Sequence, residues 1–365
     1  MAKFNDEYDY LFHLLSCVLN GTQPEELPES LDFQRLFKIA CHHSVANMAF
    51  YAVEKLKNGP EEELRKKWSI VRDKAILREM SQQHEFDLIC SMLKQNHMRC
   101  LPVKGIFLKD LYPQRDMRMM ADIDILLDNE NVIKMRTILP SMGYQSDEMD
   151  EDDHDAYFKR PVMNIEIHRC LFGRGGAKFA EMFADPWQYA TEISPYVWSF
   201  NTTWFFIYLF AHLEKHYEFA GTGIRTVMDI WVYINAYKDA LDWDFIYAQF
   251  DKIGSLDFLK DILELCEIWF NNKPHSSKFD EMTAYILDSG TYGKKSTMIA
   301  HQKERKGKFG YVLYRAFIPL KQMKPLYPIL RKAPFLLPFF WIVRLVSRLL
   351  FRRKNIAAEI RDLRN

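Results

Sequence analysis

The fold is decided by the stretch Lys104-Gly105-Ile106-Phe107-Leu108-Lys109-Asp110-Leu111-Tyr112-Pro113 and, shortly after it, Arg118-Met119-Met120-Ala121-Asp122-Ile123-Asp124-Ile125-Leu126-Leu127. The second part ends in an apolar strand that carries two carboxylates one residue apart. Successive strand side chains point to opposite faces, so Asp122 and Asp124 share one face while Ile123 and Ile125 take the other. Two neighbouring carboxylates repel each other unless a cation lies between them, and a hard cation such as Mg²⁺ is expected. The pair therefore predicts a phosphoryl or nucleotidyl transfer site.

The turn before this strand supports the prediction. A short extended segment, residues 100–103, leads into Lys104-Gly105, and a helix over residues 106–111 is expected to start at that glycine. Glycine lets backbone N–H groups approach a phosphate closely, and a helix N-terminus adds partial positive charge. The turn is therefore a candidate phosphate-binding element.

Two more charged residues complete the candidate site, which matters because a strand with two acidic residues is often only a solvent-facing edge. Arg118 lies just upstream of the aspartates, and Glu166 lies on a later strand, in Asn164-Ile165-Glu166-Ile167-His168. A third carboxylate would complete a site for one or two metal ions, which can hold the attacking and leaving oxygens of an in-line displacement.

The composition narrows the range of protein classes. A chain of 365 residues is long enough for two domains, and an apolar share of 48% can fill large cores. Lys and Arg number 49, as do Asp and Glu, so there is no global positive field, and a nucleic-acid role would need a local patch. The cysteines are scattered without a Cys-x-x-Cys pair, which argues against a zinc ribbon or a disulfide scaffold.

Targeting segments are not evident. The N-terminus lacks a basic segment that leads into an apolar one, so no secretory signal is expected. The richest apolar run, residues 335–343, is about half as long as the roughly 20 residues of a membrane-spanning helix. We therefore expect a cytoplasmic protein.

Hydrophobic spacing divides the chain into four parts. Residues 1–98 are expected to form an N-terminal helical region, and residues 99–200 a small α+β core. Residues 201–305 are expected to form a helical domain that closes the cleft. Residues 306–365 should form basic helices that prolines keep short or kinked.

Individual elements follow from the same patterns. Helices are expected over residues 7–19, 31–56, 61–97, 129–142, 204–216, 226–237 and 245–270. Strands are expected over residues 122–127, 156–159 and 162–168, and the acidic run 147–155 is expected to be a solvated loop.

These motifs resemble the bacterial uncharacterised nucleotidyltransferase family of the polymerase-beta-like superfamily. The resemblance covers most of residues 99–350 and rests on Lys104-Gly105 through Tyr112-Pro113, Arg118, Asp122-Ile-Asp124-Ile-Leu, Gly143-Tyr144, Glu166-Ile-His168, His212-x-x-x-His216, Gly223-Ile224-Arg225, Asp229 and the Pro-rich segment from Leu326 to Arg344. It implies an α+β fold with a small mixed-sheet nucleotidyltransferase core embedded between N-terminal and C-terminal helical regions.

The resemblance also implies roles for single residues. Asp122 and Asp124 would bind Mg²⁺ (or Mn²⁺), Glu166 would be the third carboxylate, and Gly105 would form the phosphate turn. Two positions depart from the superfamily pattern. Ile106 stands where the usual turn has a serine, so no hydroxyl is available to the phosphate, and the third carboxylate is Glu rather than Asp.

Four side chains in the helical half are further candidates for nucleotide binding. His212 and His216 are four residues apart and share one helical face, and Arg225 and Asp229 follow. We hypothesise that they line the cleft and hold the triphosphate or the acceptor; the alternative is that the histidines only pack or face solvent. The spacing His-Leu-Glu-Lys-His is not the His-Glu-x-x-His of zinc proteases, which disfavours a zinc hydrolase.

The expected activity is nucleotidyl transfer. An NTP, such as ATP, would give its NMP to a hydroxyl or amine acceptor, and pyrophosphate would be released. The acidic trio would be catalytic, while Lys104 and Arg118 would neutralise charge on the phosphates. The acceptor, whether a sugar, another small molecule, a protein or RNA, does not follow from the sequence. The alternative is a non-catalytic nucleotide-binding or scaffold protein of the same fold.

A basic stripe near the C-terminus suggests a further property. Arg344, Arg348 and Arg352 recur every four residues, next to Arg353 and Lys354. Such a helix can lie on an anionic membrane surface or meet nucleic acid or a partner, unless it is only the solvated face of a docked helix. Peripheral membrane contact is therefore a hypothesis for this segment.

Overall fold

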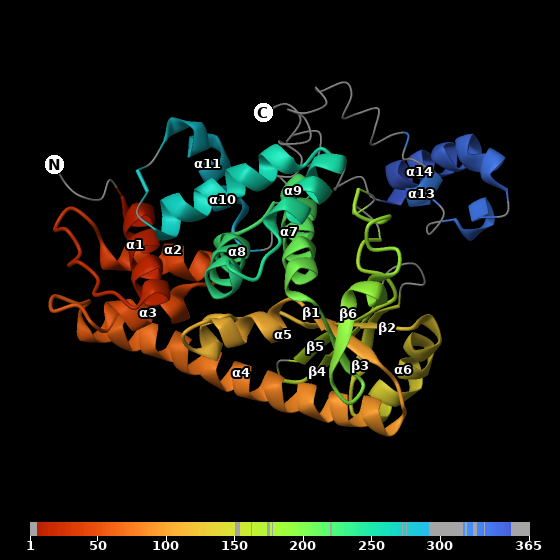
Figure 1. Ribbon diagram of the computed structural model, residues 1–365, viewed down its shortest axis with the longest axis horizontal. Helices are drawn as coiled ribbons and strands as arrows, with labels where there is room; N and C mark the ends of the chain where they lie inside the picture. Colours follow the sequence, from red (N-terminus) through yellow and green to blue (C-terminus); the bar gives the residue numbers. More distant parts are fainter. Residues whose placement is uncertain are drawn as a thin grey trace.

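The computed structural model describes residues 6–149, 154–161, 163–173, 176, 178–219, 221–271, 273–274, 276–291, 317, 320–323, 327–331 and 333–351. The architecture is α+β, which confirms the fold class expected from the sequence. One mixed sheet lies between a long helix, accompanied by a shorter one, on one side and a group of helices on the other (Figure 1).

The described strands form a seven-stranded sheet in the order β3-β4-β5-β2-β1-β7-β6. Their bounds are β1 Cys100–Val103, β2 Ile123–Leu127, β3 Gln145–Met149, β4 His154–Lys159, β5 Met163–His168, β6 Ala190–Ser194 and β7 Val197–Phe200. Strand β2 is parallel to β5 and β1 is parallel to β7, whereas the other neighbours are antiparallel. The parallel pairing brings β2 and β5, which are distant in sequence, side by side at the centre of the sheet.

Helices surround this sheet. The α-helices are α1 Glu7–Asn20, α2 Phe33–His42, α3 Ala46–Val53, α4 Glu62–Gln95, α5 Gly105–Leu108, α6 Asn129–Ser141, α7 Thr202–Phe219, α8 Ile224–Tyr237, α9 Trp243–Lys252, α10 Leu256–Phe270, α11 Asp280–Ser289, α13 Leu320–Met323 and α14 Leu337–Phe351. Short 3-10 turns, at Lys109–Leu111, Arg115–Met117, Pro186–Tyr189, Ser277–Phe279, Pro328–Arg331 and Pro334–Leu336, connect some of them.

One face of the sheet is apolar and is covered by α4 and α6. Ile123 and Ile125 of β2, with Ile165 and Ile167 of β5, pack in one cluster with side chains of these two helices. Because strand side chains alternate, the residues between them, Asp124 and Glu166, face the other side. The apolar face therefore fixes the orientation of the polar one.

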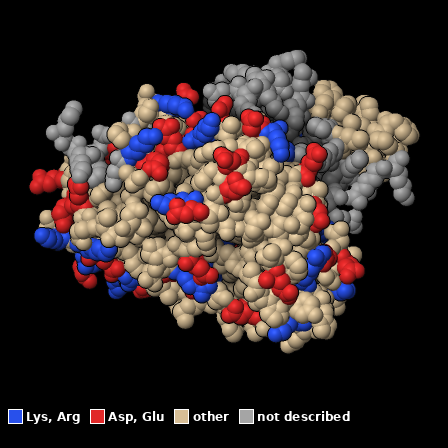
Figure 2. Space-filling view, in the orientation of Figure 1, with Lys and Arg blue, Asp and Glu red and all other residues tan. Residues whose placement is uncertain are grey.

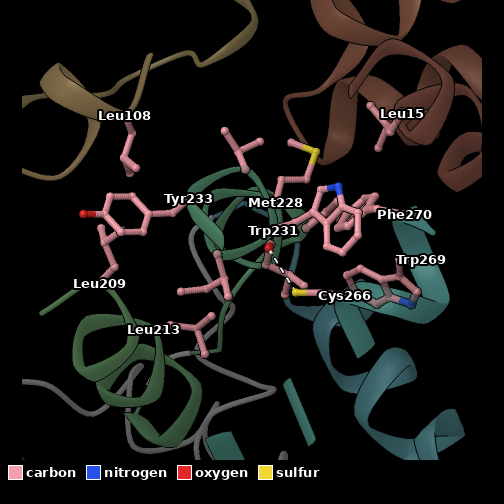
Figure 3. Close-up of a cluster of buried hydrophobic side chains, with 14 of the residues drawn as sticks. Leu15, Leu108, Leu209, Leu213, Met228, Trp231, Tyr233, Cys266, Trp269 and Phe270 are labelled. Atoms are coloured by element: carbon pink, nitrogen blue, oxygen red, sulfur yellow. Dashed lines mark hydrogen bonds between the residues drawn. The ribbon is translucent and has the colours of Figure 1, made fainter. Parts of the chain in front are cut away.

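The helices of both halves of the chain share one core. Figure 3 shows Met228, Trp231 and Tyr233 of α8 among side chains from α1, α5, α7 and α10. The thiol of Cys266 in α10 donates a hydrogen bond to the carbonyl of Val227 at 3.5 Å. Each large apolar side chain buried in this way contributes roughly 1.5–3 kcal/mol. The core continues across the boundaries expected at residues 98 and 200, which remain predictions.

Two helices that the sequence predicted to be continuous are interrupted. Residues 31–56 divide into α2 and α3, where Ser44 has a φ of 54°, and residues 245–270 divide into α9 and α10, where Gly254 has a φ of 69°. A residue in the left-handed region cannot continue a right-handed helix. Glycine at position 254 was a visible signal for the break, whereas Ser44 was not.

The strand predictions need two corrections. Residues 147–155 were expected to form a solvated loop, but β3 extends to Met149 and β4 begins at His154; residues 150–153 lie outside the described residues. Pairing with β4 satisfies the backbone of this acidic edge strand, which outweighs its composition. The hairpin of β6 and β7 was not predicted. Its turn places Tyr196 at a φ of 67°, a conformation that the sequence does not signal.

The C-terminal segment is described only in part. Helices α13 and α14 pack around Met323 and Leu330, apart from the main core. Arg344 is buried, whereas the side chain of Arg348 and residues 352–354 of the predicted basic stripe lie outside the described residues. Within the described ranges, no helix combines the length and the apolar character that crossing a bilayer requires.

The surface carries charges of both signs. On the face that Figure 2 draws, Lys and Arg side chains are interspersed with Asp and Glu, and the described part of that face has no broad patch of one sign. A mixed surface gives a polyanion no long-range attraction. A nucleic-acid role would still depend on a local patch.

Candidate active site

A cavity of about 370 Å³ opens on the polar face of the sheet, beside α7 and α8. The sequence-predicted residues that line it are Lys104, Gly105, Arg118, Asp122, Asp124, Glu166, His212, His216 and Arg225. Asp229 is not part of the lining. Another cavity, of about 240 Å³, is lined mainly by aromatic and aliphatic side chains and one carboxylate, so it offers no comparable chemistry.

Strands β2 and β5 bring the carboxylates together. In their parallel register Asp124 lies beside Glu166, and Asp122 directly precedes β2. Neighbouring strands are about 4.8 Å apart, and alternate residues of a strand share a face. All three carboxyl groups therefore reach the same cavity from the sheet side.

Asp124 is nearly fully buried and has two close partners. Nζ of Lys104 donates a hydrogen bond to Oδ1 of Asp124 at 2.7 Å, and Nε2 of His168 lies 2.9 Å from the same oxygen. Burial by itself would raise the pKa of Asp124, but the charge of Lys104 and the contact with His168 hold this pKa well below its usual range. Burial likewise opposes the charge on Lys104, yet the attraction of Asp124 holds the pKa of Lys104 above its ordinary value. Both groups are therefore charged at neutral pH.

The pKa of Asp122 reflects its burial and its closeness to Asp124. Burial and the repulsion of Asp124 raise the pKa of Asp122 to about 6. Burial would also raise the pKa of Glu166, but its contact with His168 lowers it. A divalent cation would relieve the repulsion, and carboxylate oxygens are the ligands that Mg²⁺ and Mn²⁺ take. The donor set therefore fits such an ion.

The turn after β1 is strained at Lys104 rather than at Gly105. Lys104 has a φ of 58° and a ψ of −126°, which is rare for a residue with a side chain and is typical of functional sites. Gly105 opens α5, and a Cβ at that position would lie 2.6 Å from Sδ of Met120. A side chain at this position would therefore displace the side chain of Met120.

Arg118 and Asp229 form a buried ion pair. Nε and Nη2 of Arg118 donate to the two carboxylate oxygens of Asp229 at 2.7 and 2.8 Å, and the hydroxyl of Tyr112 donates to Oδ1 at 2.7 Å. Nη1 atoms of Arg118 and Arg225 both donate to the carbonyl of Met119, at 2.7 and 2.6 Å. The structure thus places Asp229 behind Arg118, away from the other predicted residues, where it can act on the cavity only by orienting that guanidinium.

His212 and His216 lie on one face of α7, and both line the cavity. Their Nε2 atoms are 3.1 Å apart. Burial, reinforced by the positive charge of Lys104, lowers the pKa of His212 well below its ordinary value and that of His216 to about 4. Both rings are therefore neutral at pH 7, so they can form hydrogen bonds with a ligand but add no positive charge.

Two cavity residues, His154 and His168, had no predicted role. They lie directly opposite each other on β4 and β5. His168 follows Glu166 by two residues on a strand, so the alternation of side chains was a signal for it. His154 had no such signal, because it fell in the segment that was expected to be a loop.

Comparison with known proteins identifies one family. Residues 29–271 match the family described as uncharacterised nucleotidyltransferase. This range contains every residue that lines the cavity except Thr291. No curated protein shows a significant match to the chain. Because the family match spans more than half of its length, the chain belongs to the uncharacterised nucleotidyltransferase family.

Proposed function

We propose that this protein transfers a nucleoside monophosphate from an NTP to a hydroxyl or amine acceptor, releases pyrophosphate and requires Mg²⁺ or Mn²⁺. The observation that carries the proposal is the register of β2 and β5, which sets Asp124 beside Glu166 while Asp122 faces the same cavity. Basic side chains, Lys215 and Arg225, line the cavity from the helices. The cavity thus offers carboxylates to a metal ion on one side and positive charge to a triphosphate on the other.

Each side chain has a task in this reaction. The acceptor oxygen or nitrogen attacks the α-phosphorus, the bond from that phosphorus to the bridging oxygen breaks, and pyrophosphate leaves with the electron pair. Asp122, Asp124 and Glu166 would hold the metal, and Glu166 would also take the proton of the acceptor. When bound, Mg²⁺ or Mn²⁺ would neutralise part of the negative charge on the phosphates. Lys104 and Arg225 stabilise the negative charge that develops on the phosphate oxygens.

Labelled nucleotides test the proposal directly. The full chain is incubated with each NTP, labelled at the α- or the γ-phosphate, together with Mg²⁺ or Mn²⁺ and a cell extract that supplies acceptors. We expect α-label to enter a product and γ-label to appear as pyrophosphate with one of the NTPs, and neither without a divalent ion. If every NTP stays intact with both ions, the proposal is wrong.

A non-catalytic nucleotide-binding or scaffold protein is the alternative. It is favoured by Ile106, which is buried in the apolar cluster under the sheet, so this turn offers no hydroxyl to a phosphate. Calorimetric titration with each NTP, with and without Mg²⁺, separates the two functions. Binding that does not depend on the metal and leads to no transfer would favour the alternative.

Contact with a membrane surface is a second candidate property, because of the apolar side chains around α14. Phe335, Phe339 and Ile342 are 80%, 59% and 63% exposed. Phe339 and Ile342 are three residues apart in α14 and so share one side of the helix, and Phe335 lies in the 3-10 turn that precedes it. Figure 1 shows α14 at the edge of the molecule. Exposed apolar groups beside a basic sequence, such as residues 352–354, are typical of helices that lie in an anionic membrane interface.

Liposome flotation tests this contact. We expect the full chain to float with anionic vesicles and not with neutral ones, and replacement of Phe335, Phe339 and Ile342 by serine to abolish flotation. Replacing the exposed Ile70, Leu77 and Met80 of α4 by serine is the matched control and should leave flotation unchanged. A wild-type chain that stays at the bottom with anionic vesicles would rule the contact out.

A further inference from the structure

Three side chains at one end of the acidic cluster Asp122, Asp124 and Glu166 combine nitrogen and oxygen donors. His154 of β4 pairs across the sheet with His168 of β5, and Glu166 precedes His168 by two residues on the same face. Their ligand atoms all lie within 4.8 Å of one another, and all three side chains line the cavity. Because they stand on paired strands, the backbone fixes their relative positions, as a metal site requires.

The distances suit a single ion. Nε2 of His168 lies 3.4 Å from Oε2 of Glu166, and Nε2 of His154 lies 3.8 Å from the same oxygen. Ligands bound to zinc at 2.0–2.2 Å in a tetrahedron are roughly 3.3–3.6 Å apart. Oδ1 of Asp124 lies 2.9 Å from Nε2 of His168 and accepts a hydrogen bond from Lys104, so it neighbours these three ligands without being one of them. Small rotations of these side chains would therefore complete a site with two nitrogen ligands.

The cluster is also reachable from solvent. The side chains of His154 and Glu166 are 25% and 28% exposed, and that of His168 is 10% exposed. An ion can therefore enter from the cavity without unfolding of the sheet, while the deeper His168 anchors it.

We propose that His154, Glu166 and His168 bind one first-row transition-metal ion of the kind that accepts imidazole, represented by Zn²⁺, next to the Asp122–Asp124 pair. Imidazole nitrogen is a good ligand for zinc, whereas Mg²⁺ keeps to oxygen ligands. The cavity then holds two neighbouring cation sites with different selectivity. This inference concerns metal binding without nucleotide, so it holds or fails separately from nucleotidyl transfer.

Calorimetric titration of the metal-free full chain with ZnCl₂, in the presence of excess Mg²⁺ and without nucleotide, tests the inference. We expect one Zn²⁺ per chain to bind, and Mg²⁺ not to displace it. Co²⁺ should occupy the same site and report nitrogen ligation through its visible absorption.

Matched variants locate the site. His154→Ala and Glu166→Gln should each weaken Zn²⁺ binding by at least about tenfold, the loss that even an indirect partner of a metal site causes. His154 is partly exposed at the start of its strand, so its variant should keep the fold, which the thermal unfolding curve checks. His84→Ala, at an exposed histidine of α4, should leave Zn²⁺ binding unchanged.

Three results would overturn the inference. The first is an affinity for Zn²⁺ that is the same in His154→Ala, Glu166→Gln and the wild type. The second is displacement of Zn²⁺ by Mg²⁺ at equal concentration, or no Zn²⁺ binding at all. The third is loss of binding in His216→Ala but not in His154→Ala, because that would assign the ion to the His212–His216 pair.

Discussion

His154 and Asp155, two consecutive residues of β4, face opposite sides of the sheet and enter different electrostatic environments. Asp155 is fully buried and accepts hydrogen bonds from the guanidinium groups of Arg136 and Arg169, at 2.8–3.3 Å. Two cations thus surround one carboxylate, and none of the three residues lines the cavity. The negative charge of this buried carboxylate is therefore fully compensated.

The cavity face has the opposite balance. Asp122, Asp124 and Glu166 lie together, and Lys104 and His168 are the basic groups that contact Asp124. A compensated cluster stabilises a fold, whereas carboxylates that repel each other are held by the rest of the structure and gain stability when a cation binds. Buried acidic residues therefore indicate a reactive site only where their partners leave negative charge in excess.

The largest expected effect is on the cavity face. Asp124→Asn keeps the shape of the side chain but removes the charge, so transfer of labelled NMP should fall on the order of 10³-fold. The lost pair with Lys104 is partly offset by relief of the repulsion from Asp122, so urea unfolding should show only a small loss of stability. Asp128→Asn, after the same strand but outside the cavity lining, is the control and should keep full activity. Retained transfer in Asp124→Asn would contradict the assignment.

The compensated face should respond in the opposite way. Asp155→Asn leaves two guanidinium groups without their carboxylate, which should lower the free energy of unfolding by about 3 kcal/mol in urea titrations. The partly exposed pair of Arg99 and Asp128 supplies the comparison, since Asp128→Asn should cost at most about 1 kcal/mol. At urea concentrations below its unfolding transition, the Asp155→Asn variant should still transfer NMP. A loss of activity without a loss of stability would mean that the two faces are not separate.

The pH dependence of stability should have opposite signs on the two faces. Burial would raise the pKa of Asp155, but hydrogen bonds from Arg136 and Arg169 lower it, so its stabilising contribution is present above about pH 4 and is lost as the pH falls further. The pKa of Asp122, raised to about 6, means that the native state holds a proton there more tightly than the unfolded chain. For metal-free protein, its contribution therefore grows as the pH falls from about 6 to about 4.

Urea unfolding across this pH range measures both contributions. Asp122→Asn should flatten the stability curve between about pH 4 and pH 6, and Asp155→Asn should flatten it below about pH 4. If Asp122→Asn left the slope in its range unchanged, the repulsion between the two aspartates would be weaker than their placement indicates.

Local patterns predicted one part of the site well. The alternation in Asp122-Ile123-Asp124-Ile125 depends only on neighbouring residues, and the structure has the two faces as expected. The spacing of His212 and His216 is local in the same sense. By contrast, the approach of Asp124 to Glu166 depends on a parallel pairing between distant strands, which no local pattern contains.

The features that local patterns did not reveal depend on long-range geometry or on backbone conformation. The motif around Arg225 and Asp229 has no feature that tells which side chain faces the cavity, because the ion pair with Arg118 forms across more than a hundred residues of sequence. The positive φ values of Ser44 and Lys104 are imposed by the surrounding packing, since neither residue type favours that region. Family resemblance supplied the reaction class, while the placement of the histidines around Glu166 needed the sheet.

The smallest expected effect concerns Gly105, which lines the cavity and lies against Met120 of the apolar cluster. A Cβ at this position would collide with the flexible side chain of Met120, so Gly105→Ala should cost about 1 kcal/mol of stability, measured in urea. In a Met120→Ala background the collision is absent. Adding Gly105→Ala to Met120→Ala should therefore cost almost no stability. The affinity for NTP is measured in the same variants. If Gly105→Ala lowers this affinity and the double variant does not restore it, the Cβ itself keeps a phosphate away from the backbone of the turn. If the affinity recovers together with stability, the glycine serves packing only, and the phosphates must be bound by Lys104 and the helical side of the cavity.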